Sequence, residues 1–296
     1  TSGRVVLAAT PIGNPGDASD RLREVLAHSD VVAAEDTRRL RSLATALGVT
    51  IRGRVMSFFE HNESGRVPQL LDRVRAGDVV AVVTDAGMPA VSDPGYSLVT
   101  ACIEAGLPVT CLPGPSAVTT ALALSGLKVG RFIFDGFAPR KPGARRDWLQ
   151  SLAGEQRACC FFESPHRLAA TLAEAADILG GDRRVAVCRE LTKMYEETRR
   201  GTLEEIAAWA ADGVRGEITV VLEGAGVSTA PVNPEDLVEE VEFRVSGGER
   251  LKDACRSVAG TAGLVKHREL YQAVLDARAA RDSDDDDSAD GLGDDG

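Results

Sequence analysis

Residues 78–95 read DVVAVVTDAGMPAVSDPG, an apolar run followed by a polar loop. The run Val79–Thr84 has the continuous apolar character of a strand that is buried on both faces of a parallel sheet. The loop 84–95 contains two Gly, two Pro and two Asp. Glycine lets another molecule approach the backbone closely, and proline fixes the loop's shape. The segment therefore predicts a strand followed by a ligand-binding loop, or by a plain turn, because turns use the same residues.

Strand-like runs of the same kind recur through the first half of the chain, with helical patterns between them. In 66–77, for example, apolar residues fall on one helical face, and in 17–29 they do so after a possible N-cap at Ser19 or Asp17. Strands that alternate with helices predict an α/β domain with a mostly parallel sheet. The other four strand-like runs are Val5–Thr10, Val31–Glu35, Val55–Glu60 and Val109–Leu112.

The segment Pro113-Gly114-Pro115 interrupts this alternation, and a second set of elements follows it. Expected strands lie at Phe132–Phe137, Cys159–Glu163, Val185–Arg189 and Ile218–Leu222, with helices at 116–125, 166–181 and 203–211. We therefore expect an α/β fold class with two α/β domains, a small helical piece and a disordered tail. The expected boundaries are 1–114, 115–228, 236–281 for a basic helical region and 282–296 for the tail.

The charge is unevenly distributed along the chain. The net charge is −11, and eight aspartates without a single Lys or Arg lie in 282–296. Such a self-repelling, apolar-poor segment is expected to be disordered. The stretch 244–281 is basic, with eight Lys or Arg against four acids, and short helices are expected at 250–258 and 264–278, joined by 260–263.

Composition excludes several classes of protein. The sequence contains no run of about 18 apolar residues, so a membrane span is not expected. The N-terminal residues lack a signal pattern, so a cytoplasmic location is expected. No Cys or His spacing matches a metal site, so we expect no metal. The cysteines form no CxxC pair and lie in apolar contexts, which favours buried free thiols over disulfides; they are Cys102, Cys111, Cys159, Cys160, Cys188 and Cys255.

Polar or Gly/Pro-rich segments follow all five strands of the first half, where ligands bind in open α/β sheets. After the first strand, Gly13-Asn14-Pro15-Gly16 has the wrong spacing for the dinucleotide fingerprint GxGxxG, and the strings GxxxxGK[ST] and GxSxG are absent. These observations disfavour a dinucleotide, a phosphate-rich nucleotide and a serine hydrolase. A small ligand held by backbone groups, with Asp85 and Asp93 nearby, is the remaining expectation. The segments are 10–17, 34–38, 59–63, 84–95 and 112–117.

Nine motifs occur in order between residues 10 and 224: TPIGNPGD, AAEDTR, EHNE, TDAGMPAVSDPGY, LPGPSA, GFAPRK, FFESPHR, RELTKMYEE and GEITVVLEG. On these motifs the chain resembles the ribosomal RNA small-subunit methyltransferase I (RsmI) family, a branch of the tetrapyrrole methylase superfamily. The resemblance covers nearly all of the chain except the acidic tail. It implies a mostly parallel first sheet, a mixed second sheet, S-adenosylmethionine (SAM) between the two domains, and a homodimer. It also implies 2′-O-methylation of a cytidine in the decoding region of 16S rRNA in the small ribosomal subunit.

The resemblance also implies the residues that contact SAM. They are Pro11, Asp85, Gly87, Met88, Pro89, Ser116, Ala117, Phe162 and Ile218. The chain departs from the family pattern at Met88, where Thr is expected, and at Pro15, where Leu is expected. A backbone contact from Met88 is still compatible with this difference. Residues 92–95 are expected to hold the loop and cap the next helix.

Methyl transfer to a 2′-hydroxyl needs in-line alignment, and a general base assists it. The candidate catalytic residues are Glu35, Asp36 and His61, with Glu63, Glu163 and His166 as further candidates. The bland alternatives are that His61 is a structural hydrogen-bonding residue and that Glu35–Arg38 is simply a helix N-terminus.

RNA binding requires cations that neutralise phosphates. Arg38, next to the acidic pair, is one candidate. A Pro/Gly-rich loop supplies Arg140, Lys141, Arg145 and Arg146, unless it is only a solvated surface loop. The C-terminal helices supply Lys266 and Arg268, unless they form a docking or dimer surface.

Two rival functions remain open on the residues. One is another SAM enzyme of the superfamily, acting on a precorrin or on the diphthamide precursor. The basic segments speak against a small tetrapyrrole. The other is a non-catalytic RNA-binding or ribosome-assembly factor, against which the intact PGPSA and DAG strings speak.

Overall fold

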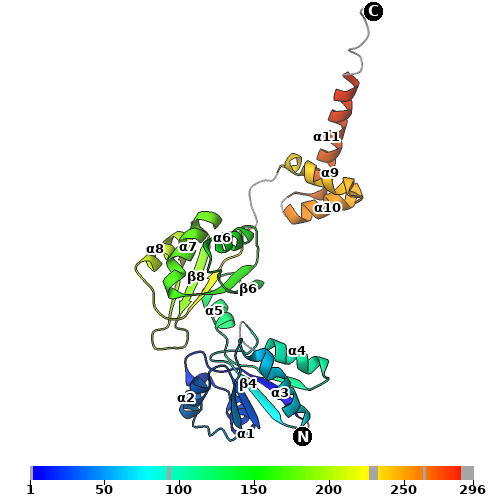
Figure 1. Cartoon of the computed structure of the whole chain (residues 1–296). Coiled ribbons are helices and arrows are strands. Elements are labelled where there is room, and N and C mark those ends of the chain that lie inside the picture. The colour runs from blue at the N-terminus through cyan, green and yellow to red at the C-terminus, as the bar shows by residue number, and fades with distance from the viewer. Residues whose placement is uncertain (1–2, 92–94, 227–232, 263–264, 288–296) are drawn as a thin grey trace, which may run out of the picture. The chain divides into compact units, whose positions relative to one another are not determined.

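The computed structural model describes residues 3–91, 95–226, 233–262 and 265–287 (Figure 1). The chain forms two compact units, residues 1–225 and residues 226–296. The first unit contains two five-stranded sheets. Helices pack on both faces of each sheet and bury an apolar cluster on each face. The two α/β folds expected from the sequence are therefore confirmed.

The first sheet is wholly parallel, with strand order β3-β2-β4-β1-β5. Helices α1 and α2 pack on one face and helices α3 and α4 on the other. The central strands are buried on both faces, which is why they are continuous apolar runs. The elements are β1 Arg4–Ala8, α1 Asp20–His28, β2 Val31–Ala34, α2 Thr37–Leu47, β3 Arg54–Ser57, α3 Glu63–Arg75, β4 Val79–Val83, α4 Tyr96–Glu104 and β5 Val109–Leu112.

The neighbouring strands β1 and β4 send their chains to opposite faces of this sheet. The chain after β1 leads to α1 on one face, and the chain after β4 leads to α4 on the other. At this point Thr10 and Gly87 exchange backbone hydrogen bonds, with N···O distances of 2.9 and 3.1 Å. Strands that diverge in this way leave a crevice at their carboxyl ends, the usual ligand position in an open α/β sheet.

The second sheet is mixed, with strand order β6-β7-β10-β8-β9. The β6–β7 pair is parallel and the other pairs are antiparallel. Helices α6, α7 and α8 cover one face, and α5 together with Ile12 packs on the other. The elements are α5 Ala117–Ser125, β6 Phe132–Phe137, α6 Pro142–Ser151, β7 Ala158–Glu163, α7 Pro165–Leu179, β8 Arg184–Arg189, β9 Glu197–Thr202, α8 Leu203–Ala211 and β10 Ile218–Leu222.

Several elements were not anticipated from the sequence. Strand β9 (ETRRGT) is polar and lies at the sheet edge, so it lacks an apolar signal. The segment 140–146 was expected to be a loop, but from Pro142 onward it is the start of α6, because Pro142 occupies the first helical position, where its missing N–H costs nothing. Helices α2 and α4 were expected only by their starts, as a possible helix N-terminus at Glu35–Arg38 and a helix after residue 95, without bounds.

The second unit consists of η2 Pro234–Leu237, α9 Val238–Ser246, α10 Leu251–Ala262 and α11 His267–Asp287, packed around their own apolar core. Helix α9 was not predicted, and α10 extends into the segment expected to link two helices. Helix α11 continues to Asp287, so it includes the first residues of the expected tail; residues 288–296 lie outside the described part. The unit is not strongly basic, since η2 and α9 add Glu235, Asp236, Glu239, Glu240 and Glu242.

All six cysteines are free thiols. Five are buried as expected, but Cys111 is exposed, because it lies on β5 at the edge of the first sheet. Burial raises the pKa of the Cys160 thiol to about 12. Within the described ranges, no helix has the length and hydropathy to cross a membrane.

Candidate active site

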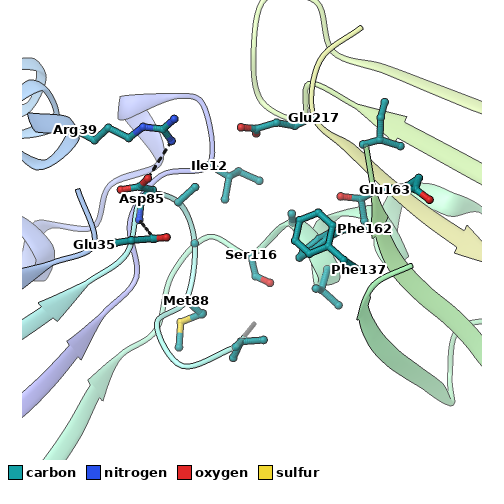
Figure 2. A pocket seen from close by; sticks show the side chains of 17 residues that line it. Ile12, Glu35, Arg39, Asp85, Met88, Ser116, Phe137, Phe162, Glu163 and Glu217 are labelled. Carbon is teal, nitrogen blue, oxygen red and sulfur yellow. Dashed lines mark hydrogen bonds and ion pairs between the residues drawn. The ribbon is translucent and has the colours of Figure 1, made fainter. Parts of the chain in front are cut away.

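A pocket of about 440 Å³ lies between the carboxyl end of the first sheet and the second sheet (Figure 2). One wall comes from the segments after β1, β2, β4 and β5, and the other comes from β6, β7 and the start of β10. The lining residues are Ile12, Glu35, Arg39, Asp85, Ala86, Gly87, Met88, Val91, Ser116, Ala117, Val118, Phe137, Phe162, Glu163, Glu217, Ile218 and Thr219. This set includes seven of the nine residues expected to contact SAM.

Asp85 is held by the two residues that follow strand β2. Its backbone N–H donates to Glu35 Oε2 at 3.0 Å, and its Oδ1 accepts from the backbone N–H of Asp36 at 3.1 Å. Its Oδ2 lies 3.2 Å from Arg39 Nη1 (Figure 2). The carboxylates of Glu35 and Asp85 are thus fixed by reciprocal bonds between the ends of β2 and β4.

Asp36 caps helix α2 and does not line the pocket. Its Oδ1 accepts from the backbone N–H groups of Arg38 and Arg39 at 2.7 and 3.3 Å. The bond from the backbone N–H of Arg38, followed by the Arg38 side chain, lowers the pKa of Asp36 below its usual 3.8. Asp36 and Pro11 line a separate cavity of about 50 Å³ beside the main pocket. For Asp36, therefore, the helix N-terminus alternative describes its contacts.

The loop after β4 uses Gly87 to shape its backbone. Gly87 has φ +83°, a conformation that side-chain-bearing residues rarely adopt. Both its N–H and its C=O are bonded to Thr10. Met88 lines the pocket, whereas Pro89 does not. Ala90 is held at φ +65° without being glycine, which is a strained conformation. Ser92, Asp93 and Pro94 lie outside the described residues.

The N-terminus of α5 reaches the pocket through Ser116, Ala117 and Val118. Ser116 occupies the N-cap position, but its side chain accepts no capping bond. Early backbone N–H groups of a helix have no partner within the helix, and they favour a negative group. This end of the pocket therefore suits a carboxylate.

Glu163 lines the pocket, but its side chain is fully buried and its oxygens are engaged. Oε1 lies 2.6 Å from both Arg167 Nη2 and the backbone N–H of Ser164, and Oε2 accepts from Thr171 Oγ1 at 2.7 Å. Both oxygens of this carboxylate are therefore occupied by bonds within the protein. We read Glu163 as a residue that anchors α7 to the sheet.

The remaining base candidates do not line the pocket. His61 is exposed, with its ring 6.4 Å from the ring of Phe59. Glu63 accepts from the backbone N–H groups of Gly95 and Ser97, both at 3.1 Å, and so ties α3 to α4. His166 is an exposed residue in the first turn of α7.

The cations expected to bind RNA differ in availability. Arg38 is exposed and pairs with its neighbour Asp36 at 3.4 Å. Arg140 and Lys141 are exposed and have no ion pair within the described part of the chain. Arg145 is different: its side chain is 11% exposed and Nε lies 2.7 Å from Glu174 Oε2. It is a structural ion pair and not a free cation.

The other expected cations also have acidic neighbours. Arg146 lies 3.4 Å from the second oxygen of Glu174. In the second unit Lys266 pairs with Glu269 at 3.7 Å, and Arg268 is exposed.

The segment 190–196, which follows β8, joins the two α/β folds of the first unit. Glu190 and Thr192 have φ of +51° and +65°. Thr192 Oγ1 accepts from the backbone N–H of Asn14 at 3.1 Å. Lys193 Nζ lies 2.9 Å from Glu190 and 3.0 Å from the pocket residue Glu217. Bonds from the Glu217 backbone N–H and from Lys193 lower the pKa of Glu190.

The sequence reasoning did not assign several pocket residues, namely Ile12, Arg39, Ala86, Val91, Val118, Phe137, Glu217 and Thr219. Most of them lie in or beside the quoted motifs, which offered a signal. Phe137 lies within the quoted motif GFAPRK and Arg39 directly follows AAEDTR, but an arginine inside a helix and a phenylalanine on a strand carry no local mark of function of their own. Within the described residues no group of three or more Cys, His, Asp or Glu could hold a metal ion.

The chain is similar to known methyltransferases over most of its length. A family model for tetrapyrrole (corrin/porphyrin) methylases matches residues 4–207. A ribosomal RNA small subunit methyltransferase I from Mycobacterium bovis is 58% identical over 94% of this chain and 96% of its own length. The protein of the same name from Synechocystis is 40% identical over 94% and 99% of the two chains.

Solved structures support the fold. The methyltransferase CobJ aligns with a TM-score of 0.57 at 20% identity, over 76% of this chain and 95% of its own. A diphthine synthase aligns with a TM-score of 0.55 at 17% identity, over 74% and 89%.

The family model matches more than half of the chain, and the identities to full-length relatives are high. Methyltransferases of the tetrapyrrole methylase family use S-adenosylmethionine, so SAM is the cofactor here. The chain belongs to the ribosomal RNA small subunit methyltransferase I (RsmI) family of the tetrapyrrole methylases.

Proposed function

We propose that this chain binds SAM in the 440 Å³ pocket and methylates the 2′-hydroxyl of a cytidine in the decoding region of 16S rRNA. The pocket itself carries the proposal, because it lies at the carboxyl ends of the first sheet and is lined by both α/β folds. The substrate is the small ribosomal subunit or its RNA, and the enzyme acts as a cytoplasmic homodimer.

The lining chemistry fits SAM, which combines an adenosyl group with a sulfonium, an ammonium and a carboxylate. Apolar side chains of the pocket suit the adenosyl group; they include Ile12, Met88, Val91, Val118, Phe162 and Ile218. Four carboxylates against one guanidinium, that of Arg39, suit the two cationic groups. The N-terminus of α5 suits the carboxylate. The volume lies within the range of small-molecule sites.

When bound, SAM supplies an electrophilic methyl group. The chain's own contribution is to align the ribose hydroxyl with that group and to accept its proton. We assign the carboxylate of Glu35 as the general base. It lines the pocket, and only its Oε2 is engaged, by the backbone N–H of Asp85. Asp36 and His61, the other candidates, lie off the pocket wall. Asp85 and Arg39 hold the Glu35 segment in place.

Arg140 and Lys141 are the cations best suited to RNA phosphates, because both are exposed and free of acidic partners in the described residues. Arg38 adds a third cation near the pocket, at the start of α2. Of the cations expected in the Pro/Gly-rich segment, Arg145 is therefore no longer a candidate for phosphate binding, because Glu174 engages it. The exposed cations remain candidates.

One experiment tests the proposal against its rivals. The protein is incubated with methyl-labelled SAM and, separately, with small ribosomal subunits, naked 16S rRNA, a precorrin or the diphthamide precursor protein. Label recovered as 2′-O-methylcytidine from the subunit or its RNA supports the proposal. Label on a tetrapyrrole or on the protein substrate, or SAM binding without any transfer, contradicts it.

A further inference from the structure

Phe137 is a large apolar side chain at the mouth of the pocket. It lines the pocket, yet 62% of its surface is exposed. It belongs to edge strand β6, and its ring contacts Phe162 edge-on, with centroids 5.3 Å apart and planes at 60° (Figure 2). Phe162 also contacts Phe134 edge-on at 5.1 Å. One face of the Phe137 side chain is thus supported by the protein while much of its surface faces solvent.

A β-bulge places Phe137 on this side of the sheet. Phe134 pairs with Cys160, but the next pair is Phe137 with Phe162, so Asp135 and Gly136 together oppose one residue of β7. Gly136 has φ +68°, which glycine adopts readily. Bulges are rare in parallel pairs, and they re-aim side chains near functional sites.

Strand alternation shows what the bulge changes. Without the extra residue, Phe137 would share a face with Asp135, two positions before it. Asp135 faces the α6 side, where its Oδ2 accepts from Trp148 Nε1 at 2.8 Å. With the bulge, Phe137 joins Phe134 and Phe162 on the pocket side. The side chain gains little burial there, so core packing does not account for its placement.

Two cations that have no ion pair among the described residues follow Phe137 closely in the chain. Arg140 and Lys141 come three and four residues later, directly before α6, and both are exposed. Aromatic rings beside a basic surface are how proteins hold single-stranded nucleic acid, with bases stacked on rings and phosphates on cations.

We propose that Phe137 is the stacking platform for a nucleobase of the RNA substrate at the pocket mouth, with Arg140 and Lys141 binding the adjacent phosphates. This inference rests on the proposed function and deepens it, since it names a residue that selects an unstacked nucleotide. SAM occupies the inner pocket, and the exposed ring faces the incoming strand.

The test replaces Phe137 by Ala, Leu, Tyr and Trp, with Phe132→Ala as matched control. Phe132 is also exposed, at 44%, on the same strand, but it does not line the pocket. Loss of one stacked base is expected to raise KM for small ribosomal subunits roughly 5- to 150-fold in Phe137→Ala. Phe137→Leu should behave like Ala, whereas Tyr and Trp should restore KM. The Phe137 variants should keep the SAM affinity, measured by calorimetry, and the thermal stability of the unaltered protein. The kinetics of Phe132→Ala should also match those of the unaltered protein.

A second readout does not depend on turnover. The tryptophan emission of Phe137→Trp should be quenched by a single-stranded RNA oligonucleotide from the decoding region, beyond the quenching of the unaltered protein. An unchanged KM in Phe137→Ala overturns the inference. A loss of SAM affinity as large as the rise in KM also overturns it, because Phe137 would then contact the cofactor. A change of oligomeric state, measured by light scattering, overturns it as well, because Phe137 would then contact a second copy of the chain. If the unaltered protein does not label the subunits at all, the proposed function fails instead.

Discussion

Asp85 both forms hydrogen bonds that shape its loop and lines the pocket. A substitution there can distinguish these two roles, because one affects the stability of the fold and the other affects SAM affinity. Asp85→Asn keeps an acceptor for the Asp36 N–H but removes the charge opposite Arg39. Because the Arg39 side chain is 65% exposed, its pair with Asp85 is worth only about 0–1 kcal/mol. We expect SAM affinity to fall about tenfold or more while the melting temperature changes little. Calorimetry and thermal unfolding measure the two. Asp72→Asn, which removes an exposed pair with Arg75 away from the pocket, is the control; equal SAM affinity in both variants would show that Asp85 only shapes the loop.

Glu35 tests the chemistry at the same scale. Glu35→Gln retains an oxygen that accepts the Asp85 N–H, so the loop geometry should survive. Loss of a general base is expected to lower kcat roughly 10²- to 10⁴-fold with SAM affinity unchanged. Single-turnover transfer from labelled SAM measures this. His61→Gln, at a candidate that lies off the pocket, should leave kcat unaltered. A kcat of Glu35→Gln within threefold of the unaltered enzyme would remove Glu35 from the mechanism.

At the scale of elements, helix α2 depends on the charge of its N-cap. The pKa of Asp36 is lower in the folded protein than its usual 3.8, so its ionised form stabilises the fold. That contribution is present above about pH 4 and is lost as the pH falls through the lowered pKa. Asn also caps helices well but carries no charge. Asp36→Asn should therefore melt below the unaltered protein at pH 7, and the two should converge as the pH falls below the lowered pKa of Asp36. A difference that stays constant across this range in thermal unfolding would contradict the argument.

At the scale of the whole molecule, the pocket belongs entirely to the first unit. Its lining residues run from Ile12 to Thr219, and that unit has its own buried cores. A chain ending at Ala225 should therefore fold and bind SAM with an affinity within about threefold of the full chain. Calorimetry and circular dichroism check this. A soluble, folded truncation that binds SAM more than tenfold more weakly would show that the second unit contributes to the cofactor site.

Every strand of the two sheets except β9 could be predicted from the amino-acid sequence. Continuous Val- and Ala-rich runs such as Val79–Val83 are unambiguous because both of their faces are buried, and the nine ordered motifs indicated the family. Strand β9 escaped prediction because its sequence, ETRRGT, is polar and it pairs with β8 at the sheet edge. Helix α9 does carry apolar residues at helical spacing, Val238, Val241 and Val245, but the expected helices began only at residue 250. The excess of cations in 244–281 likewise depended on where the window began, since α9 supplies acids just before it.

Only the tertiary structure decided which polar residues share the pocket. Strand-end carboxylates look alike in sequence, yet Glu35 lines the pocket, Asp36 caps a helix and Glu63 bonds to the start of α4. The direction of Phe137 depends on one bulge, because a single extra residue exchanges the two faces of a strand. Local composition fixes whether a segment is a strand or a helix. The contacts between segments far apart in the chain fix which side chains meet, and that is what separates a turn from an active-site loop.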